Sequence, residues 1–327
     1  MRTPGQPARI FPRQVRAHNS DVIGVIAPGS PIDRDRLEAG CGVLHKLGYR
    51  TFYFDSIFDR DLYFAGTHRR RVWELEQMFQ RQDIAAIVCA RGGYGCNHLL
   101  SRLNLNVVRA NPKIFVGYSD VTTLLTYFCD HADMVTYHGP MVTSDYAIAG
   151  DDFAASALIA ATATSEFVIR AAPPGRQPRP GKASGVLYGG CLSMLAASLG
   201  TPYEIDCAGC ILFVEDINTK PYQIDRMLMQ LKLANKLNGV RGIVFGEMKD
   251  CQQPGGQDYT LQDAVMRVLH DIDVPVGFGL HSGHVTAQPN IMLPIGVAID
   301  LEVSEKEIVL RYPQRNHGFN GSNGARQ

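Results

Sequence analysis

Long apolar runs are missing from this 327-residue sequence, and so is an excess of charge of either sign. A membrane-spanning helix needs roughly 20 consecutive apolar residues, and no run in the chain approaches that length. The 32 basic residues balance the 32 acidic ones, so no global field attracts nucleic acid or an anionic lipid surface. We therefore expect a soluble protein that binds neither nucleic acid nor a membrane.

The sequence also has no recognisable secretory signal and few cysteines. Residues 1–20 are rich in arginine but contain no continuous apolar stretch, which predicts a disordered lead-in and a cytoplasmic protein. Eight cysteines are too sparse for a disulfide scaffold in a chain of this length. Cys207 and Cys210 have the CxxC spacing of half a zinc site, but no second CxxC or histidine pair completes a set of four ligands. We therefore expect no metal.

The order of the apolar segments predicts an α/β fold. From residue 21 onwards, short apolar runs alternate with helical patterns, which is typical of parallel βαβ units. The run "IAAIVCA" is fully apolar, as buried parallel strands are, and it leads directly into "RGGYG". Thr67 can cap the helix expected in "THRRRVWELEQMFQRQ". This α/β domain is predicted to occupy residues 21–165.

A change in composition marks the next boundary. Residues 166–185 include "AAPPGRQPRPGKASG", which is rich in proline, glycine and arginine and predicts a linker or mobile loop. A second domain is expected over residues 186–315, with strands in "GCILFVED" and "RGIVFGEM" and a helix in "YQIDRMLMQLKLANKL" between them. Residues 316–327 are predicted to form a disordered tail.

One serine occupies a position that favours chemistry. In "KIFVGYSDVTTLLTYF", residues 113–118 have the pattern of a buried strand, and the apolar face of a helix follows them. Ser119 is thus expected between the carboxyl end of a strand and the start of a helix, where open α/β sheets bind their ligands. Its hydroxyl could be a nucleophile on a sharp turn, or it could only cap the helix.

A serine nucleophile requires a base, and the base requires a carboxylate that orients it. Glu215 and Asp216 end the apolar run "LFVED", while His281 and His284 lie in the glycine-rich "GFGLHSGHV". His138 is a third candidate base, and spacing alone does not choose among the three histidines. Successive side chains of a strand face opposite ways, so only one of the two acids is expected to meet the base.

The segment "RGGYG" at residues 91–95 permits three interpretations. A glycine loop between a strand and a helix can cradle a phosphate, but this one matches neither GxGxxG nor the eight-residue phosphate loop. Its backbone amides could instead face an oxyanion, which is the interpretation we favour. The third interpretation is a tight turn without a ligand.

Several segments of the chain have a familiar sequence and order. They are "FAGTHRRR", "ARGGYG", "NPKIFVGYSDVTTLL", "YHGPM", "GVLYGGCLSML", "FVEDI" with "PYQIDRMLMQL", and "GLHSGHV". Together they resemble the LD-carboxypeptidase family of serine peptidases over most of the chain, from Gly24 to Asp300. That family includes muramoyl-tetrapeptide carboxypeptidases, which remove the terminal D-alanine from cytoplasmic cell-wall tetrapeptides. It also includes immunity hydrolases that cleave peptidyl-nucleotide antibiotics.

The resemblance implies roles for the matching positions. The nucleophile falls on Ser119 in "GYSD", the acid on Glu215 in "FVED" and the base on His284 in "SGHV". With these roles, the amides of Gly93 and Asp120 are expected to hold the oxyanion. The other residues expected to bind substrate are Arg91, Gly92, Tyr94, His138 and Cys191.

The resemblance also implies an architecture and a reaction. The expected fold is an N-terminal domain with a flavodoxin-like parallel sheet and a β-rich α+β C-terminal domain, with the site between them, in a homodimer. The expected reaction releases terminal D-alanine from a muropeptide tetrapeptide by hydrolysis of an L,D peptide bond, without a cofactor. The alternatives are an immunity-type hydrolase of aminoacyl- or peptidyl-nucleotide amides and a non-catalytic module that binds muropeptides.

Three positions depart from the family pattern. His68 stands where an acidic residue is expected, and Cys191 stands where an asparagine is common. The segment "INTK" lacks the acidic residue that often precedes "PY".

Overall fold

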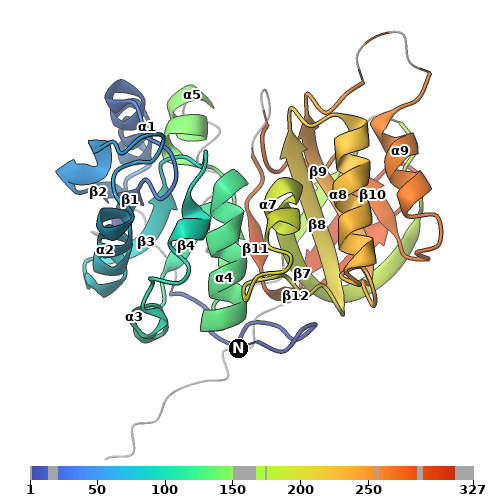
Figure 1. The fold of residues 1–327 in the computed structure, drawn as a ribbon, viewed down its shortest axis with the longest axis horizontal. Coiled ribbons are helices and arrows are strands. Elements are labelled where there is room, and N and C mark those ends of the chain that lie inside the picture. The colour runs from blue at the N-terminus through green and yellow to red at the C-terminus, as the bar shows by residue number, and fades with distance from the viewer. Residues whose placement is uncertain are drawn as a thin grey trace, which may run out of the picture.

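The fold contains two β-sheets that lie beside each other, with helices packed on both (Figure 1). No helix of the described residues is long and apolar enough to cross a membrane. The predicted tail, residues 316–327, lies outside the described ranges. The computed structural model describes residues 2–13, 21–149, 167–173, 175–253, 255, 258–285 and 290–313.

The first sheet has six strands in the order β11-β5-β4-β3-β1-β2. They are β1 (Val22–Ile26), β2 (Arg50–Phe52), β3 (Ile84–Cys89), β4 (Ile114–Gly117), β5 (Thr136–His138) and β11 (Leu293–Ile295). The strands β1 to β5 pair in parallel, and β11 pairs antiparallel with β5. The order 2-1-3-4-5 is that of flavodoxin-like folds, which confirms the predicted architecture of this domain.

Helices cover both faces of the first sheet, as a buried parallel sheet requires. Ile23 of β1 belongs to the same apolar cluster as Leu37 of α1, whereas Ile26 belongs to the cluster that contains Leu75 of α2. The Thr67 hydroxyl accepts a hydrogen bond from Arg70 N at 3.2 Å, so the predicted helix cap is confirmed. The helices are α1 (Arg34–Lys46), α2 (His68–Gln80), α3 (Leu105–Ala110), α4 (Thr122–Ala132) and α5 (Ala147–Ala149).

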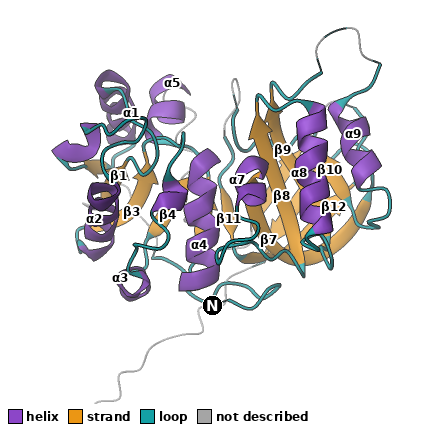
Figure 2. Ribbon diagram, viewed as in Figure 1, coloured by secondary structure: helices purple, strands orange, loops and turns teal. Residues whose placement is uncertain are grey.

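The second sheet has seven strands in the order β10-β9-β8-β7-β12-β13-β6. They are β6 (Phe167–Ala171), β7 (Gly181–Cys191), β8 (Cys210–Ile217), β9 (Gly242–Lys249), β10 (Val276–Phe278), β12 (Val297–Val303) and β13 (Ile308–Tyr312). The strands β7 to β10 pair in parallel, and β12, β13 and β6 extend the sheet in antiparallel fashion. The helices are α7 (Leu192–Ala197), α8 (Pro221–Leu233) and α9 (Leu261–Val268), of which α7 and α8 lie in front of the strands in Figure 2.

Half of the predicted linker over residues 166–185 forms strands. Residues 167–171 form β6, which pairs with β13, and β7 begins at residue 181 and pairs with β12 along residues 181–187. The proline- and glycine-rich composition hides these strands because their partners lie more than a hundred residues away in the chain. Ladder hydrogen bonds to those distant partners decide the conformation here.

Two further boundaries differ from the prediction. Residues 2–13 are not a free lead-in, because Arg2 forms an ion pair with Asp130 at 2.9 Å and Ala8 is buried. Residues 14–20 of the predicted lead-in lie outside the described part of the chain. The strand β11 falls within the predicted second domain, residues 186–315, yet it joins the first sheet. The C-terminal part of the chain therefore contributes one strand to the N-terminal sheet.

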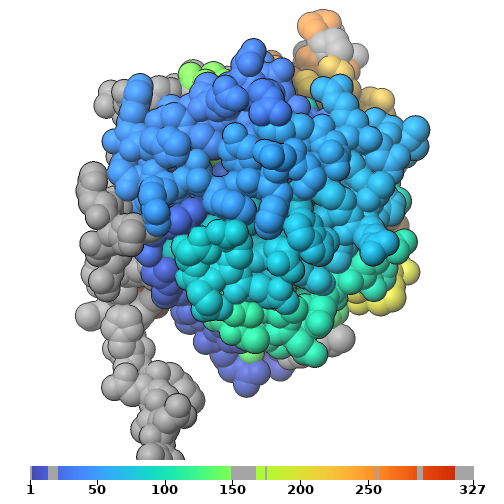
Figure 3. Space-filling view, turned by 90° about the vertical axis from the view of Figure 1, so that its left-hand side faces the viewer, coloured from blue at the N-terminus to red at the C-terminus, as the bar shows by residue number. Residues whose placement is uncertain are grey.

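The two sheets still occupy separate parts of the molecule. Viewed from the side of the first sheet, most of the surface belongs to the N-terminal part of the chain, coloured from blue to green (Figure 3). At the boundary, the backbone N–H of Cys191 at the end of β7 donates to the Thr122 hydroxyl at the start of α4, over 3.0 Å. The carboxyl end of β7 therefore contacts the N-terminal domain at the start of α4.

Candidate active site

Ser119 lies on a sharp turn between β4 and α4. The strand ends at Gly117, and the short helix η3 (Ser119–Val121) begins two residues later. The φ angle of Ser119 is 62°, in the left-handed region that costs a residue with a Cβ about 1–2 kcal/mol. Within the described part of the chain its hydroxyl makes no hydrogen bond, and η3 has no side-chain cap. The strained turn favours the nucleophile over the helix cap.

The glycine-rich loop lies against this serine. A Cβ at Gly92 would come within 2.9 Å of the Ser119 Cβ, 3.1 Å of its Oγ and 3.2 Å of Asp120 N, so a side chain does not fit there. Gly93 has a φ angle of 95° and packs closely on Ser30. The backbone of the loop at Gly92 therefore packs directly on the start of η3.

Asp120 and the rim residues of the loop have different surroundings. Asp120 is buried, and its carboxylate accepts a hydrogen bond from Cys96 N at 3.0 Å, which fixes the far end of the loop to the serine turn. The side chains of Arg91 and Tyr94 are exposed at the edge of the glycine-rich loop. Arg91 donates to Pro31 O at 3.3 Å. Both rim side chains are accessible to a ligand.

Glu215 and His284 form a hydrogen-bonded pair. Glu215 lies on β8 and is fully buried, and its Oε2 is 2.6 Å from His284 Nδ1. The same oxygen accepts the backbone N–H of His284 at 3.3 Å. The Tyr118 ring, one residue before Ser119, packs edge-on against the His284 imidazole with centroids 4.9 Å apart. The nucleophile turn and the histidine loop thus meet, although they are far apart in the sequence.

The electrostatics of this pair favour the charged forms of both groups. Burial alone would raise the pKa of Glu215, but His284 and His138 lower it to about 2. Burial likewise lowers the pKa of His284, but the Glu215 carboxylate outweighs burial, so the pKa of His284 lies above its ordinary value of 6.5. Each partner therefore stabilises the charged form of the other.

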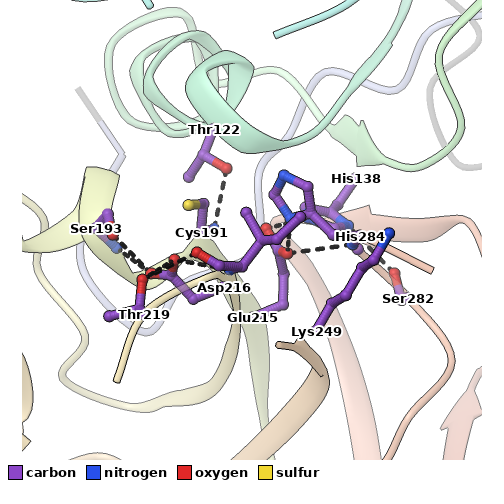
Figure 4. A network of polar contacts seen from close by, with 12 residues as sticks. Thr122, His138, Cys191, Ser193, Glu215, Asp216, Thr219, Lys249, Ser282 and His284 are labelled. Carbon is purple, nitrogen blue, oxygen red and sulfur yellow. Dashed lines mark hydrogen bonds and ion pairs between the residues drawn. The ribbon is translucent and has the colours of Figure 1, made fainter. Parts of the chain in front are cut away.

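Asp216 faces away from His284, as the alternation of side chains along a strand requires. Its Oδ2 accepts hydrogen bonds from Ser193 N at 2.9 Å and Ser193 Oγ at 2.7 Å, and its Oδ1 accepts one from Thr219 Oγ1 at 2.9 Å. Figure 4 shows the two acids directed to opposite sides of β8. Asp216 therefore anchors the start of α7 rather than the base.

The other two candidate histidines have other partners. His138 is fully buried, with Nδ1 3.2 Å from Ser282 Oγ and Nε2 3.6 Å from Glu215 Oε1. The burial of His138 does not support its predicted contact with substrate, because no part of its side chain is exposed. His281 lies 3.8 Å from Glu247 on the surface side of the loop.

Two residues that depart from the family pattern, Cys191 and His68, have defined surroundings in the fold. Cys191 is buried beside Glu215 in the strand register, and burial together with the two acids raises the pKa of its thiol well above the usual range. Its thiol is therefore no nucleophile, and its burial does not support the predicted substrate contact. His68 stacks on His98 with ring centroids 4.6 Å apart.

Two functional candidates have no sequence signal that could have found them. Asp145, in the short helix η4 (Val142–Tyr146), and Asn290, in a loop, are buried polar residues that no motif or spacing distinguishes. They meet only in the folded chain, where Asn290 Nδ2 donates to Asp145 Oδ1 at 3.1 Å. Among the described residues, no group of three or more histidine, cysteine or acidic side chains could hold a metal ion.

Comparisons with known proteins match both parts of the chain. The N-terminal domain of the LD-carboxypeptidases matches residues 23–139, and the C-terminal domain of the same family matches residues 184–301. A probable murein peptide carboxypeptidase of Bacillus subtilis is 36% identical over 301 residues, which are 90% of this chain and 92% of that protein. The murein tetrapeptide carboxypeptidase of Pseudomonas aeruginosa is 30% identical over 274 residues, 80% of this chain and 87% of that one.

A solved structure has the same fold. The crystal structure of muramoyltetrapeptide carboxypeptidase from Oxalobacter formigenes superposes with a TM-score of 0.81 at 28% sequence identity. The match covers 89% of this chain and 98% of that one.

Proposed function

Because the chain belongs to the LD-carboxypeptidase family, we propose that it is a serine carboxypeptidase that releases terminal D-alanine from muropeptide tetrapeptides. The observation that carries the proposal is the 2.6 Å contact between Glu215 and His284, which provides an oriented base. The left-handed turn at Ser119 supplies the matching nucleophile position. Cytoplasmic cell-wall recycling and a homodimer are the expected setting of this activity.

The proposed mechanism is acyl transfer to a serine. Ser119 Oγ attacks the carbonyl of the L,D peptide bond while His284 Nε2 takes its proton. His284 then returns the proton to the amine of the departing D-alanine, and a water molecule hydrolyses the acyl-enzyme by the same route. Glu215 holds the imidazole through Nδ1 and stabilises its charged form.

Stabilisation of the oxyanion is assigned to backbone amides. Gly92 packs against the Ser119 turn, and the amides of the next residue, Gly93, and of Asp120 would receive the negative oxygen of the tetrahedral intermediate. Arg91 and Tyr94 at the exposed rim are the candidates to bind the free carboxylate and the body of the peptide.

The experiment that tests this function is mass spectrometry of a purified muropeptide tetrapeptide after incubation with the protein. Loss of one alanine residue, with a tripeptide and free D-alanine as products, supports the proposal. Incubation with an aminoacyl-nucleotide amide in parallel tests the immunity-type alternative. Binding of tetrapeptide without cleavage of either compound would establish a binding module and contradict the proposal.

The rate of D-alanine release should fall on the acid side with a midpoint above pH 6.5. Only the neutral imidazole can accept the proton of Ser119, and Glu215 raises the pKa of His284, so the inactive protonated form persists to a higher pH than for a free histidine. The measurement is the pH profile of kcat/KM. A midpoint at or below 6.5 would mean that Glu215 does not act on His284 in the free enzyme.

A further inference from the structure

A chain of buried polar contacts connects the loop of Ser119 to the loop of His284. Its members, which we call the bracket, are Tyr118, Asp145, Asn290 and Gly283. Asn290 Oδ1 accepts Gly283 N at 3.0 Å, and Asn290 Nδ2 donates to Gly283 O at 2.9 Å and to Asp145 Oδ1 at 3.1 Å. Asp145 in turn interacts with the Tyr118 side chain, and the burial of Tyr118 and the Asp145 carboxylate raise the pKa of the Tyr118 hydroxyl.

The bracket ends on both sides next to a reacting residue. Tyr118 precedes Ser119, and Gly283 precedes His284, so one side-chain pair spans the two loops. Asp145 lies in η4 (Val142–Tyr146) of the N-terminal domain, whereas Asn290 follows the histidine loop in the C-terminal part of the chain. The contact between them therefore fixes the two loops relative to each other.

The orientation of the Asn290 amide is determined by its partners. Gly283 N can only donate and must face the amide oxygen, while Gly283 O and the Asp145 carboxylate accept and must face the amide nitrogen. Asn290 is fully buried and Asp145 is 5% exposed, so water does not replace these bonds readily. An aspartate or a leucine of similar size at position 290 would lose part of this set.

The backbone at Gly283 leaves little tolerance for displacement. Its φ angle is 113°, and a Cβ there would lie 2.5 Å from Glu215 Oε2. The peptide that leads into His284 is thus pressed against the acid that orients the imidazole. A small shift of this peptide changes the contact between Glu215 and His284.

Asp145 also contributes charge to the site. Burial raises the pKa of Asp145 to about 6, although Met141 N, Asn290 and Tyr118 stabilise its charged form. The groups that act on His284 are then Glu215 and Asp216 from β8 and Asp145 from η4, and all three raise the pKa of the imidazole.

We propose that Asn290 and Asp145 are positioning residues, which hold the base loop in register with the nucleophile turn without touching substrate. This proposal rests on the proposed roles of Ser119 and His284. It predicts that the bracket sets turnover and the His284–Glu215 contact rather than substrate affinity.

The test compares Asn290→Ala with a matched control, Asn111→Ala. The control also deletes a hydrogen bond from a side chain to the backbone, that of Asn111 Nδ2 to Val107 O, but this bond lies at the end of α3. Asn290→Ala should lower kcat about 10²-fold, since misplacement of a reacting group by roughly 1 Å costs that much, with KM changed by less than about threefold. The pKa of His284, followed by NMR, should fall towards or below 6.5 as the Glu215 contact weakens. Asn111→Ala should change neither quantity.

A second variant decides the matter if Asn290→Ala does not fold. Asp145→Asn keeps the shape but turns an amide N–H towards one of two donors, Asn290 Nδ2 or Met141 N, and it should also lower kcat. Loss of the Asp145 charge lowers the pKa of His284 by itself, so kcat is the deciding quantity for this variant. Unchanged kcat in a folded variant would overturn the proposal. The NMR titration needs no substrate, so it separates failure of the bracket from failure of the proposed function, which would appear as an inactive wild-type protein.

Discussion

Replacement of Ser119 by alanine should abolish the release of D-alanine, with kcat lowered by about 10⁴-fold or more, because no other group can form the acyl-enzyme. The fold should be retained, since the Ser119 hydroxyl makes no hydrogen bond within the described part of the chain. The measurement is the rate of D-alanine release by purified Ser119→Ala, with thermal unfolding of the same sample.

Ser119→Gly and Ser193→Ala are the controls for this result. Glycine removes the hydroxyl but accepts the φ angle of 62° without strain, so it should be inactive yet more stable than the alanine variant by about 1 kcal/mol. Ser193→Ala deletes a hydroxyl bonded to Asp216 and should leave turnover nearly unchanged. A folded Ser119→Ala that retained more than about a hundredth of the wild-type rate would show that Ser119 is not the nucleophile.

The nucleophile turn could be predicted from the sequence because its signals are local. The apolar run that forms β4 and the helical spacing that forms α4 lie directly on either side of Ser119. The flavodoxin-like strand order was implied by the resemblance, and the strand-helix alternation is consistent with it. Short-range patterns of this kind need no knowledge of distant partners.

The strands β6 and β11 could not be predicted in the same way. Each is short and obtains its hydrogen bonds from a strand far away in the sequence, β13 for β6 and β5 for β11. The position of His138 behind Glu215 and the contact of Asn290 with Asp145 have the same origin. Such contacts depend on how the two sheets meet, which no local period encodes.

Replacement of Glu215 by glutamine should lower kcat by roughly 10²- to 10⁴-fold with little change in KM. Glutamine keeps the shape of the side chain, but it no longer stabilises the charged imidazole. If its amide nitrogen faces His284 Nδ1, the imidazole carries its proton on Nε2 and cannot accept the proton of Ser119. The comparison is with Asp216→Asn, which loses an acceptor for Ser193 and should cost stability but little turnover.

The pH dependence of Glu215→Gln gives an independent check on the same assignment. Burial alone lowers the pKa of His284, so removal of the carboxylate should move the acid limb of the residual activity to lower pH than in the wild type. The stability of the fold should respond as well. The pKa of Glu215 is about 2 in the folded protein, compared with an ordinary value of 4.5. The ionised carboxylate therefore stabilises the fold above pH 4.5, and this stabilisation is lost as the pH falls towards 2. The glutamine variant should lack that part of the acid destabilisation. Equal losses of turnover in Glu215→Gln and Asp216→Asn, with an acid limb that does not move, would mean that Glu215 is not the residue that orients His284.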